Sequence, residues 1–230
     1  MPLATYSLRR NLARDDPPDG VPVSHAWMTE TELASALAQA WRSNREHVER
    51  VVLAAAVITT ALDRAGMRAT LVGGAAIEFH APTAYATTDL DFVVEGRTRE
   101  AIDETLTSLG MQRQGRHWVL DDLFVEVPGS YQSEPTELFE IGPFTLRVVK
   151  KEYVLGDRII GYRWWKYAGY GLQAVDMIDA FAGELDDAAL RAHLRKERAE
   201  DTYDLLLQLS ASGTPATVEE LDALWHLHYS

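Results

Sequence analysis

The sequence predicts an α/β (α+β) protein in which a small mixed sheet is preceded and followed by helices. Apolar residues recur at helical spacing before residue 67, the period changes to that of strands between residues 68 and 150, and helical spacing returns after about residue 152. A chain of 230 residues has room for one such core with helical additions or for two small domains. Residues 1–28 have no periodic apolar face, and we expect them to form a flexible arm. We expect N-terminal helices over residues 29–67, the core over 68–150 and a C-terminal helical region over 151–230.

The composition excludes several classes of protein. The 22 Lys and Arg residues against 35 Asp and Glu residues give a net charge of −13, which argues against a protein that coats duplex nucleic acid but leaves room for an enzyme with one basic groove. The absence of Cys excludes disulfides, a Cys nucleophile and Cys-ligated metal sites. The longest apolar run, residues 51–62, is too short to span a membrane, and the N-terminus lacks the apolar segment of a secretory signal, so we expect a cytoplasmic protein.

Two capping boxes mark the predicted starts of helices. Thr29 and Glu32 have the spacing of the first box, and Thr217 and Glu220 have the spacing of the second, which begins the last helix. The buried face of the first helix would consist of Leu33, Leu37, Ala40 and Trp41.

The remaining elements follow from periodicity and from glycines. A second helix over about 44–65 ends at Gly66, and a helix over 97–109 ends at Gly110. Strands are predicted over residues 68–72, 89–94, 111–120, 123–128, 137–141 and 144–150.

Two segments of the core carry residues from which function can be inferred. Gly73 and Gly74 end an apolar strand and begin a helix, so that the backbone N–H groups and the helix dipole can meet a phosphate at close range. Asp89 and Asp91 are two residues apart in a strand and therefore project from one face, about 6.6–6.8 Å apart along the chain. Two carboxylates so placed suit hard cations, Mg²⁺ or Mn²⁺, of the kind that lie about 3.5–4 Å apart in two-metal phosphoryl transfer.

This combination resembles the nucleotidyltransferase superfamily of the DNA polymerase β type, whose signature is an hG[G/S] turn followed by [D/E]h[D/E]h. The match covers residues 71–94, about a tenth of the chain, and its Gly-Gly form is most similar to the AbiEii- and MenT-like toxin nucleotidyltransferases. The resemblance implies a nucleotidyltransferase core over 68–150 and transfer of a nucleoside monophosphate from an NTP to an acceptor hydroxyl on a tRNA end, a protein or a small molecule. It also implies Mg²⁺ or Mn²⁺ as cofactor and a toxin role with a cognate antitoxin as partner. The lack of an apolar run long enough to span a membrane indicates no membrane partner.

The resemblance also assigns roles to individual residues. Asp89 and Asp91 would bind metal, and a third carboxylate would come from a later strand. Glu126 fits, because an acid in an apolar strand is costly unless it meets a metal or a partner; an exposed acidic strand face is the alternative. Asp122 lies on the same face by alternation and is the fallback. The nucleotide would be bound by Gly73, Gly74, Thr88, Arg158 and Lys166.

The C-terminal region matches the toxin-like families less completely. Arg158 and Lys166 are candidate counter-charges for a triphosphate, and they lie in a segment, 147–166, with six basic and two acidic residues. Asp201 fits the first Asp of a Lys-Asp-x-x-Asp element as a further catalytic residue, but Glu200 replaces the Lys, and Tyr85 stands where related sequences often carry Arg. Ordinary surface charges on helices are the alternative for these residues, and a non-catalytic nucleotide-binding or regulatory module with the same fold is the alternative for the chain.

Aromatic residues are concentrated in the same basic segment. They could stack a base, but we expect them to pack between helices. They are Tyr162, Trp164, Trp165, Tyr167 and Tyr170.

Overall fold

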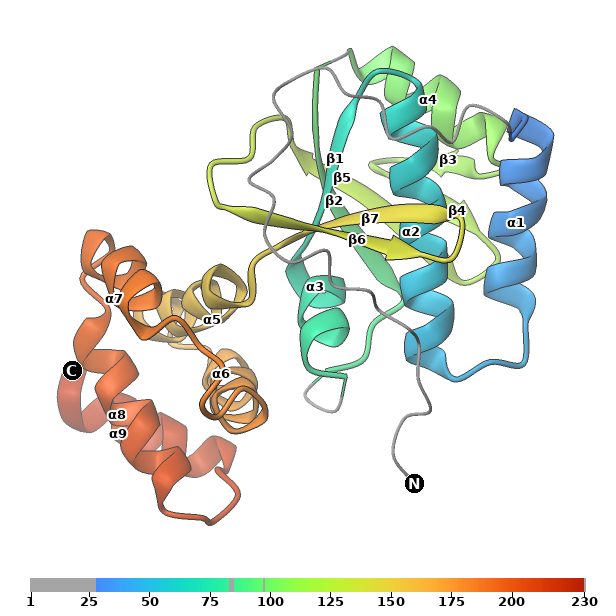
Figure 1. The fold of residues 1–230 in the computed structure, drawn as a ribbon. Coiled ribbons are helices and arrows are strands. Elements are labelled where there is room, and N and C mark those ends of the chain that lie inside the picture. Colours follow the sequence, from blue (N-terminus) through green and yellow to red (C-terminus); the bar gives the residue numbers. More distant parts are fainter. Residues whose placement is uncertain (1–27, 83–84, 97, 230) are drawn as a thin grey trace. The chain divides into compact units, whose positions relative to one another are not determined.

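In the computed structural model, which describes residues 28–82, 85–96 and 98–229, helices precede and follow seven strands that form one mixed sheet (Figure 1). The predicted fold class is confirmed. The described residues form two units, one containing residues 28–75 and 87–149 and the other containing residues 76–86 and 150–229. The predicted arm lies outside the described residues except for Met28, which is buried.

The sheet belongs to the first unit, and its strand order is β3-β4-β5-β2-β1-β7-β6. Strand β2 runs parallel to β5, and β1 runs parallel to β7, whereas the other neighbouring strands are antiparallel. The first residues of β2 and β5 and the last residues of β1 therefore meet at one edge of the sheet. The strands are β1 (Arg68–Val72), β2 (Asp89–Glu95), β3 (Gln112–Gln114), β4 (His117–Leu120), β5 (Leu123–Gly129), β6 (Thr136–Ile141) and β7 (Phe144–Val149).

The prediction of one strand over 111–120 is wrong. This segment is a hairpin of β3 and β4, in which Gly115 adopts a φ of +64° in the turn. Glycine reaches this left-handed region without a Cβ clash, which allows the chain to reverse there.

Helices α1 (Glu30–Arg42), α2 (His47–Arg64) and α4 (Arg99–Ser108) belong to the first unit, in which α2 packs on β1 and β7 and α4 packs on β3 (Figure 1). The capping box at Thr29 is present and the predicted face of α1 is buried, so both predictions are confirmed. Apolar side chains of the central strands form the core of this unit, with no exposed surface at Leu71, Leu90, Phe92 and Val125.

The second unit is built from helices that pack in pairs, α5 with α6 and α7, and α6 with α8 and α9. The second capping box is confirmed, since the Thr217 hydroxyl accepts from the backbone N–H of Glu220 at 3.2 Å. The buried Tyr162 hydroxyl donates to the carbonyl of Leu221 at 2.6 Å, which joins α5 to α9. The helices are α5 (Lys151–Trp165), α6 (Ala168–Ala180), α7 (Asp187–Lys196), α8 (Glu200–Ala211) and α9 (Val218–Tyr229).

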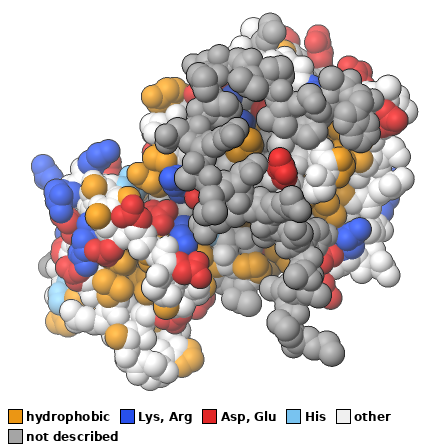
Figure 2. All heavy atoms as spheres, in the orientation of Figure 1, with side chains coloured by type: hydrophobic (Ala, Val, Ile, Leu, Met, Phe, Trp, Pro, Cys, Tyr) orange, Lys and Arg blue, Asp and Glu red, His pale blue; other side chains and the backbone are white. Residues whose placement is uncertain are grey.

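The surface carries charges of both signs. On the face drawn in Figure 2, acidic and basic side chains are interspersed over the described surface. None of the described helices is both long and apolar enough to pass through a bilayer.

Candidate active site

The two aspartates of β2 occupy the outward positions of an alternating strand. Asp89 is exposed and Asp91 is half-buried, whereas Leu90 and Phe92 between and after them are fully buried. Alternation in a strand therefore places both carboxylates on the face opposite the apolar core, as predicted.

The glycine turn lies directly against one of these carboxylates. Gly73 is the first residue of α3 (Gly73–His80) and has a φ of +63°. A Cβ atom at Gly73 would lie 2.4 Å from Oδ2 of Asp91, closer than any real contact. Glycine is therefore required at position 73 for two reasons, the left-handed backbone conformation and the close approach of the Asp91 carboxylate. Gly74 follows as the second residue of α3, whose first N–H groups have no partner within the helix.

The predicted third carboxylate is adjacent to Asp91 in the sheet. Glu126 of β5 is in register with Asp91, and Phe124 is in register with Asp89. Neighbouring strands lie about 4.8 Å apart, and residues in register on parallel strands project from the same face. The sheet thus brings Asp89, Asp91 and Glu126 to one face near one edge.

The Glu126 carboxylate is held by neighbouring basic side chains. Its Oε2 lies 3.4 Å from Nε of Arg116 and 3.2 Å from Nε2 of His117, which is in register with it on β4. Neither Arg116 nor His117 was predicted from the sequence. The signal for them is the two-residue turn Asp121–Asp122, in which Asp121 has a φ of +56°, because this turn joins β4 to β5 and sets the register that pairs His117 with Glu126.

The donor set fits a divalent metal ion in its chemistry. The three side chains offer carboxylate oxygens, which Mg²⁺ and Mn²⁺ prefer to nitrogen or sulfur ligands. Within the described ranges, however, no group of three or more His, Asp or Glu side chains is arranged to hold a metal ion. The Glu126 carboxylate faces Arg116 and His117, so three-carboxylate binding would require Glu126 to exchange these partners for the metal.

The entry to β2 is fixed by Thr87, which was not among the site residues predicted from the sequence. The Thr87 hydroxyl accepts from the backbone N–H of Asp89 at 3.0 Å, and the Thr87 carbonyl lies 2.9 Å from Nε2 of His47. The predicted Thr88 contributes its carbonyl to the sheet, where it accepts from the N–H of Phe124 at 3.0 Å. The spacing of Thr87 and Asp89 is that of a local hydroxyl-to-backbone turn, which was the available signal.

The fallback carboxylate has a structural partner. Asp122 precedes β5 rather than lying within it, and its Oδ1 accepts from the indole N–H of the buried Trp41 at 2.7 Å. The adjacent Asp121 pairs with Arg42 at 2.7 Å, and this hydrogen bond lowers the pKa of the Asp121 carboxyl. These contacts tie the end of α1 to the turn before β5.

The other predicted site residues belong to the second unit. The Arg158 guanidinium lies 4.9 Å from the centre of the Tyr170 ring, and Nζ of Lys166 lies 4.0 Å from the centre of the Trp225 ring. Asp201 is exposed and lies 3.7 Å from Arg163. Within their own unit, Arg158 and Lys166 thus contact aromatic rings and Asp201 contacts a guanidinium.

The expectation that the aromatic residues of this segment pack between helices is only partly right. Tyr162 is 1% exposed and packs as expected. In contrast, Trp164, Trp165 and Tyr167 have exposed fractions of 51%, 68% and 58%. They lie where α5 ends and α6 begins, and helix–helix contacts leave these rings uncovered.

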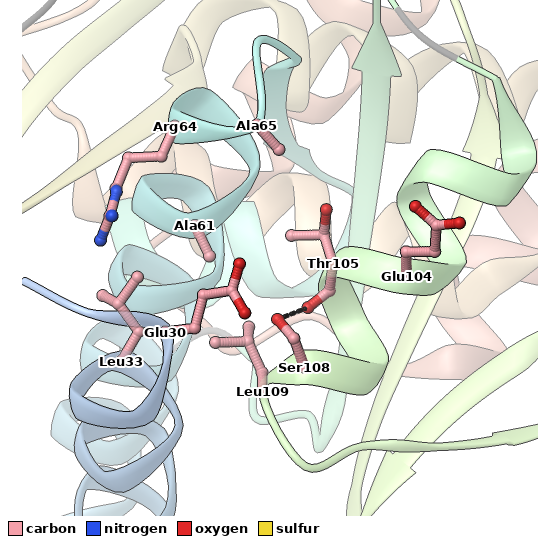
Figure 3. A pocket seen from close by; sticks show the side chains of 9 residues that line it. All are labelled: Glu30, Leu33, Ala61, Arg64, Ala65, Glu104, Thr105, Ser108 and Leu109. Atoms are coloured by element: carbon pink, nitrogen blue, oxygen red, sulfur yellow. Dashed lines mark hydrogen bonds between the residues drawn. The ribbon is translucent and has the colours of Figure 1, made fainter.

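A pocket of about 390 Å³ opens among α1, α2 and α4 (Figure 3). Its lining combines Glu30, Arg64 and Glu104 with small polar and apolar side chains, and the Ser108 hydroxyl in it donates to the carbonyl of Thr105. None of the predicted site residues lines it. The carboxylates of β2 and β5 therefore define the candidate site, and this pocket is separate from it.

No protein-family model and no curated protein matches the chain. The fold is similar to that of an antigenic nucleotidyltransferase-like protein from Paracoccidioides brasiliensis, with 18% identity, a TM-score of 0.45, and 68% of this chain and 91% of that chain covered. It is also similar to the solution structure of the antibiotic-resistance factor ANT(2'')-Ia, with 13% identity, a TM-score of 0.49, and 73% of this chain and 100% of that chain covered. At these values, neither similarity assigns an activity or a residue role to this chain.

Proposed function

We propose that the chain is a metal-dependent nucleotidyltransferase that moves a nucleoside monophosphate from an NTP to an acceptor hydroxyl. The observation that carries the proposal is the contact between Asp91 and Gly73, which puts a strand carboxylate against the glycine turn that begins α3. Asp89 adds a second carboxylate on the same face of the strand. Ligands for a hard cation and backbone donors for a phosphate therefore occur side by side, as the reaction requires.

Each residue of the site has a distinct task in this proposal. Asp89 and Asp91 would hold the two divalent cations, and Glu126 would complete the ligands of one of them after leaving Arg116 and His117. When bound, Mg²⁺ or Mn²⁺ would lower the pKa of the acceptor hydroxyl and neutralise charge on the departing pyrophosphate. The absence of a side chain at Gly73 lets the phosphates approach the backbone, and the first N–H groups of α3 donate to their oxygens.

The assignments of Arg158, Lys166 and Asp201 rest on the family resemblance. Single substitutions of each, measured for NTP binding and for transfer, test these roles one at a time. Loss of NTP affinity is expected for the two basic residues, and loss of transfer with intact NTP binding is expected for Asp201.

The test of the proposal is transfer of label from each α-labelled NTP, with Mg²⁺, to total tRNA, to protein or to small molecules of a cell extract. The wild-type chain should label an acceptor, and the Asp89→Asn/Asp91→Asn variant should not. Asp122→Asn is the matched control, because its amide oxygen can still accept from Trp41 while one acid of the same region is lost. Equal labelling by all proteins, or no labelling by any of them, would overturn the proposal.

One observation favours a second candidate, a non-catalytic module that binds nucleotides. The third carboxylate, Glu126, already has partners within the protein, since its Oε2 lies 3.4 Å from Nε of Arg116 and 3.2 Å from Nε2 of His117. Such a module would bind NTP, as measured by calorimetry, without labelling any acceptor. Binding combined with transfer would exclude it.

We include in the proposal a biological setting as the toxin of a toxin–antitoxin pair, of the AbiEii- and MenT-like kind. Its support is the form of the segment 71–94. Expression of the chain should arrest bacterial growth, Asp89→Asn/Asp91→Asn should not, and the product of a neighbouring gene should relieve the arrest. Growth arrest by the double variant would exclude the toxin role, and it would leave the proposed nucleotide transfer to be decided by the labelling experiment.

A further inference from the structure

Four consecutive exposed residues, Trp164, Trp165, Lys166 and Tyr167, lie where α5 ends and α6 begins, and we name them the aromatic turn. Its three aromatic side chains have exposed fractions of 51%, 68% and 58%. Soluble proteins seldom leave large rings grouped in water, and such groups commonly mark binding surfaces. The aromatic turn is the strongest concentration of exposed rings in the described chain.

The exposed rings are nevertheless held in place from below. A Cβ atom at Gly161 would lie 2.7 Å from the Tyr170 ring and 3.3 Å from the Trp165 ring. A Cβ atom at Gly169 would lie 2.7 Å from the Tyr167 ring. The ring centres of Trp165 and Tyr167 are 5.7 Å and 5.0 Å from that of Tyr170. The backbone of the two glycines and the Tyr170 ring restrict the motion of Trp165 and Tyr167. A ligand that covers these two rings would therefore lose little side-chain entropy on binding.

The backbone of the turn is fixed as well. Lys166 has a φ of +56°, an uncommon conformation for a residue with a side chain, and it ends α5. The Trp164 indole N–H donates to the carbonyl of Glu197 at 3.0 Å, and the Lys166 ammonium lies 4.0 Å from the centre of the Trp225 ring. These contacts anchor Trp164 and Lys166 on the rest of the second unit.

The local charge identifies the class of ligand. Residues 158–170 contain three basic residues and no acid, in a chain whose net charge is −13. Of these, Arg163 is engaged by Asp201, whereas Arg158 and Lys166 lie against aromatic rings and form no salt bridge within the described part of the chain. Surfaces that bind unpaired nucleotides combine aromatic rings with cations. The rings stack on the π-face that every base has, and the cations meet the negative charge of each phosphate linkage.

We infer that the aromatic turn binds a single-stranded nucleic acid, with bases stacked on Trp165 and Tyr167 and with Arg158 and Lys166 near the phosphates. This inference goes beyond the transfer reaction, although Arg158 and Lys166 are also the residues that the family resemblance assigns to the NTP. The binding requires neither metal nor NTP.

The test is fluorescence anisotropy of a labelled 12-nucleotide single-stranded RNA, compared with DNA of the same sequence and with the RNA duplex, in the absence of Mg²⁺ and NTP. Single strands should bind better than the duplex, and a preference for RNA or DNA will identify the source of the ligand. Trp165→Ala and Tyr167→Ala should each weaken binding by about 5- to 150-fold, the effect of losing one stacked base. Trp165→Phe keeps a ring and should recover most of the affinity.

Two controls make the result specific. Tyr131→Ala removes an aromatic side chain that is 76% exposed in the first unit, and it should bind RNA as the wild type does. Asp89→Asn/Asp91→Asn should also bind normally, so that failure of the transfer proposal leaves this result intact. Equal binding of single strands and duplex with no effect of the ring substitutions would overturn the inference. A dimer that dissociates on Trp165→Ala, without RNA binding, would overturn it in favour of a contact between copies of the chain.

Discussion

Replacement of Gly73 by Ala should disable the candidate site far more than it destabilises the fold. The new Cβ would lie 2.4 Å from Oδ2 and 3.2 Å from Cγ of Asp91, whereas ordinary contacts begin near 3.4 Å. The carboxylate must therefore move by about 1 Å, a displacement that can reduce a reaction rate by about 100-fold. The φ of +63° adds roughly 1–2 kcal/mol of backbone strain, or a fall in Tm of about 2–8 °C for a chain of this length.

Gly142→Ala separates the two effects. Gly142 has a φ of +60°, nearly that of Gly73, and nothing lies within 4 Å of the Cβ that would be added there. Both variants should lose similar stability in thermal unfolding, whereas only Gly73→Ala should lose Mn²⁺ affinity, followed by electron paramagnetic resonance, and transfer of labelled nucleotide. If Gly73→Ala binds Mn²⁺ and transfers label as Gly142→Ala does, the contact with Asp91 has no functional role and the reasoning fails.

Three further predictions concern other parts of the chain. Arg116→Ala should raise Mn²⁺ affinity by up to about fivefold, because Glu126 then no longer has to give up an ion pair whose contribution to stability is about 0–1 kcal/mol. A weaker Mn²⁺ affinity in the same titration would contradict the proposed exchange of partners. Trp41→Phe should reduce the free energy of unfolding in urea by about 1–3 kcal/mol, since the Asp122 carboxylate loses its 2.7 Å donor, and unchanged stability would show that this bond is dispensable. Burial raises the pKa of Tyr203 to about 12, so the neutral side chain should contribute stability below pH 10 that is lost as the pH rises toward 12. Urea unfolding between these values should show a decline of up to about 3 kcal/mol that Tyr203→Phe lessens, and identical slopes would refute the assignment.

The features that the sequence predicted correctly are those set by neighbouring residues. The capping box at Thr29 is a hydrogen-bond pattern within one turn, and the alternation around Asp89 and Asp91 is a property of a single strand. The end of α2 before Gly66 likewise depends on local backbone conformation. Such signals are complete within a few residues, so no knowledge of the tertiary structure is needed.

The features that the sequence missed depend on which segments meet. The partners of Glu126 follow from the register between β4 and β5, which a hairpin turn sets and which periodicity does not contain. Alternation along the strand made Asp122 the fallback for the third carboxylate. Its carboxylate instead accepts a hydrogen bond from Trp41, which is 81 residues away in the sequence, so local periodicity could not predict this contact. The exposure of Trp165 was missed because helical spacing does not distinguish a ring beneath another helix from one at the end of its own helix.

The most direct measurement of the central claim is transfer of labelled nucleotide as a function of Mg²⁺ concentration, for the wild type, Asp91→Asn and Asp122→Asn. The wild type and Asp122→Asn should show transfer that saturates with Mg²⁺ and stops on chelation, and Asp91→Asn should show none at any concentration. Transfer by Asp91→Asn at the wild-type rate, or transfer that persists without divalent metal, would contradict a metal-dependent nucleotidyltransferase built on Asp91 and Gly73.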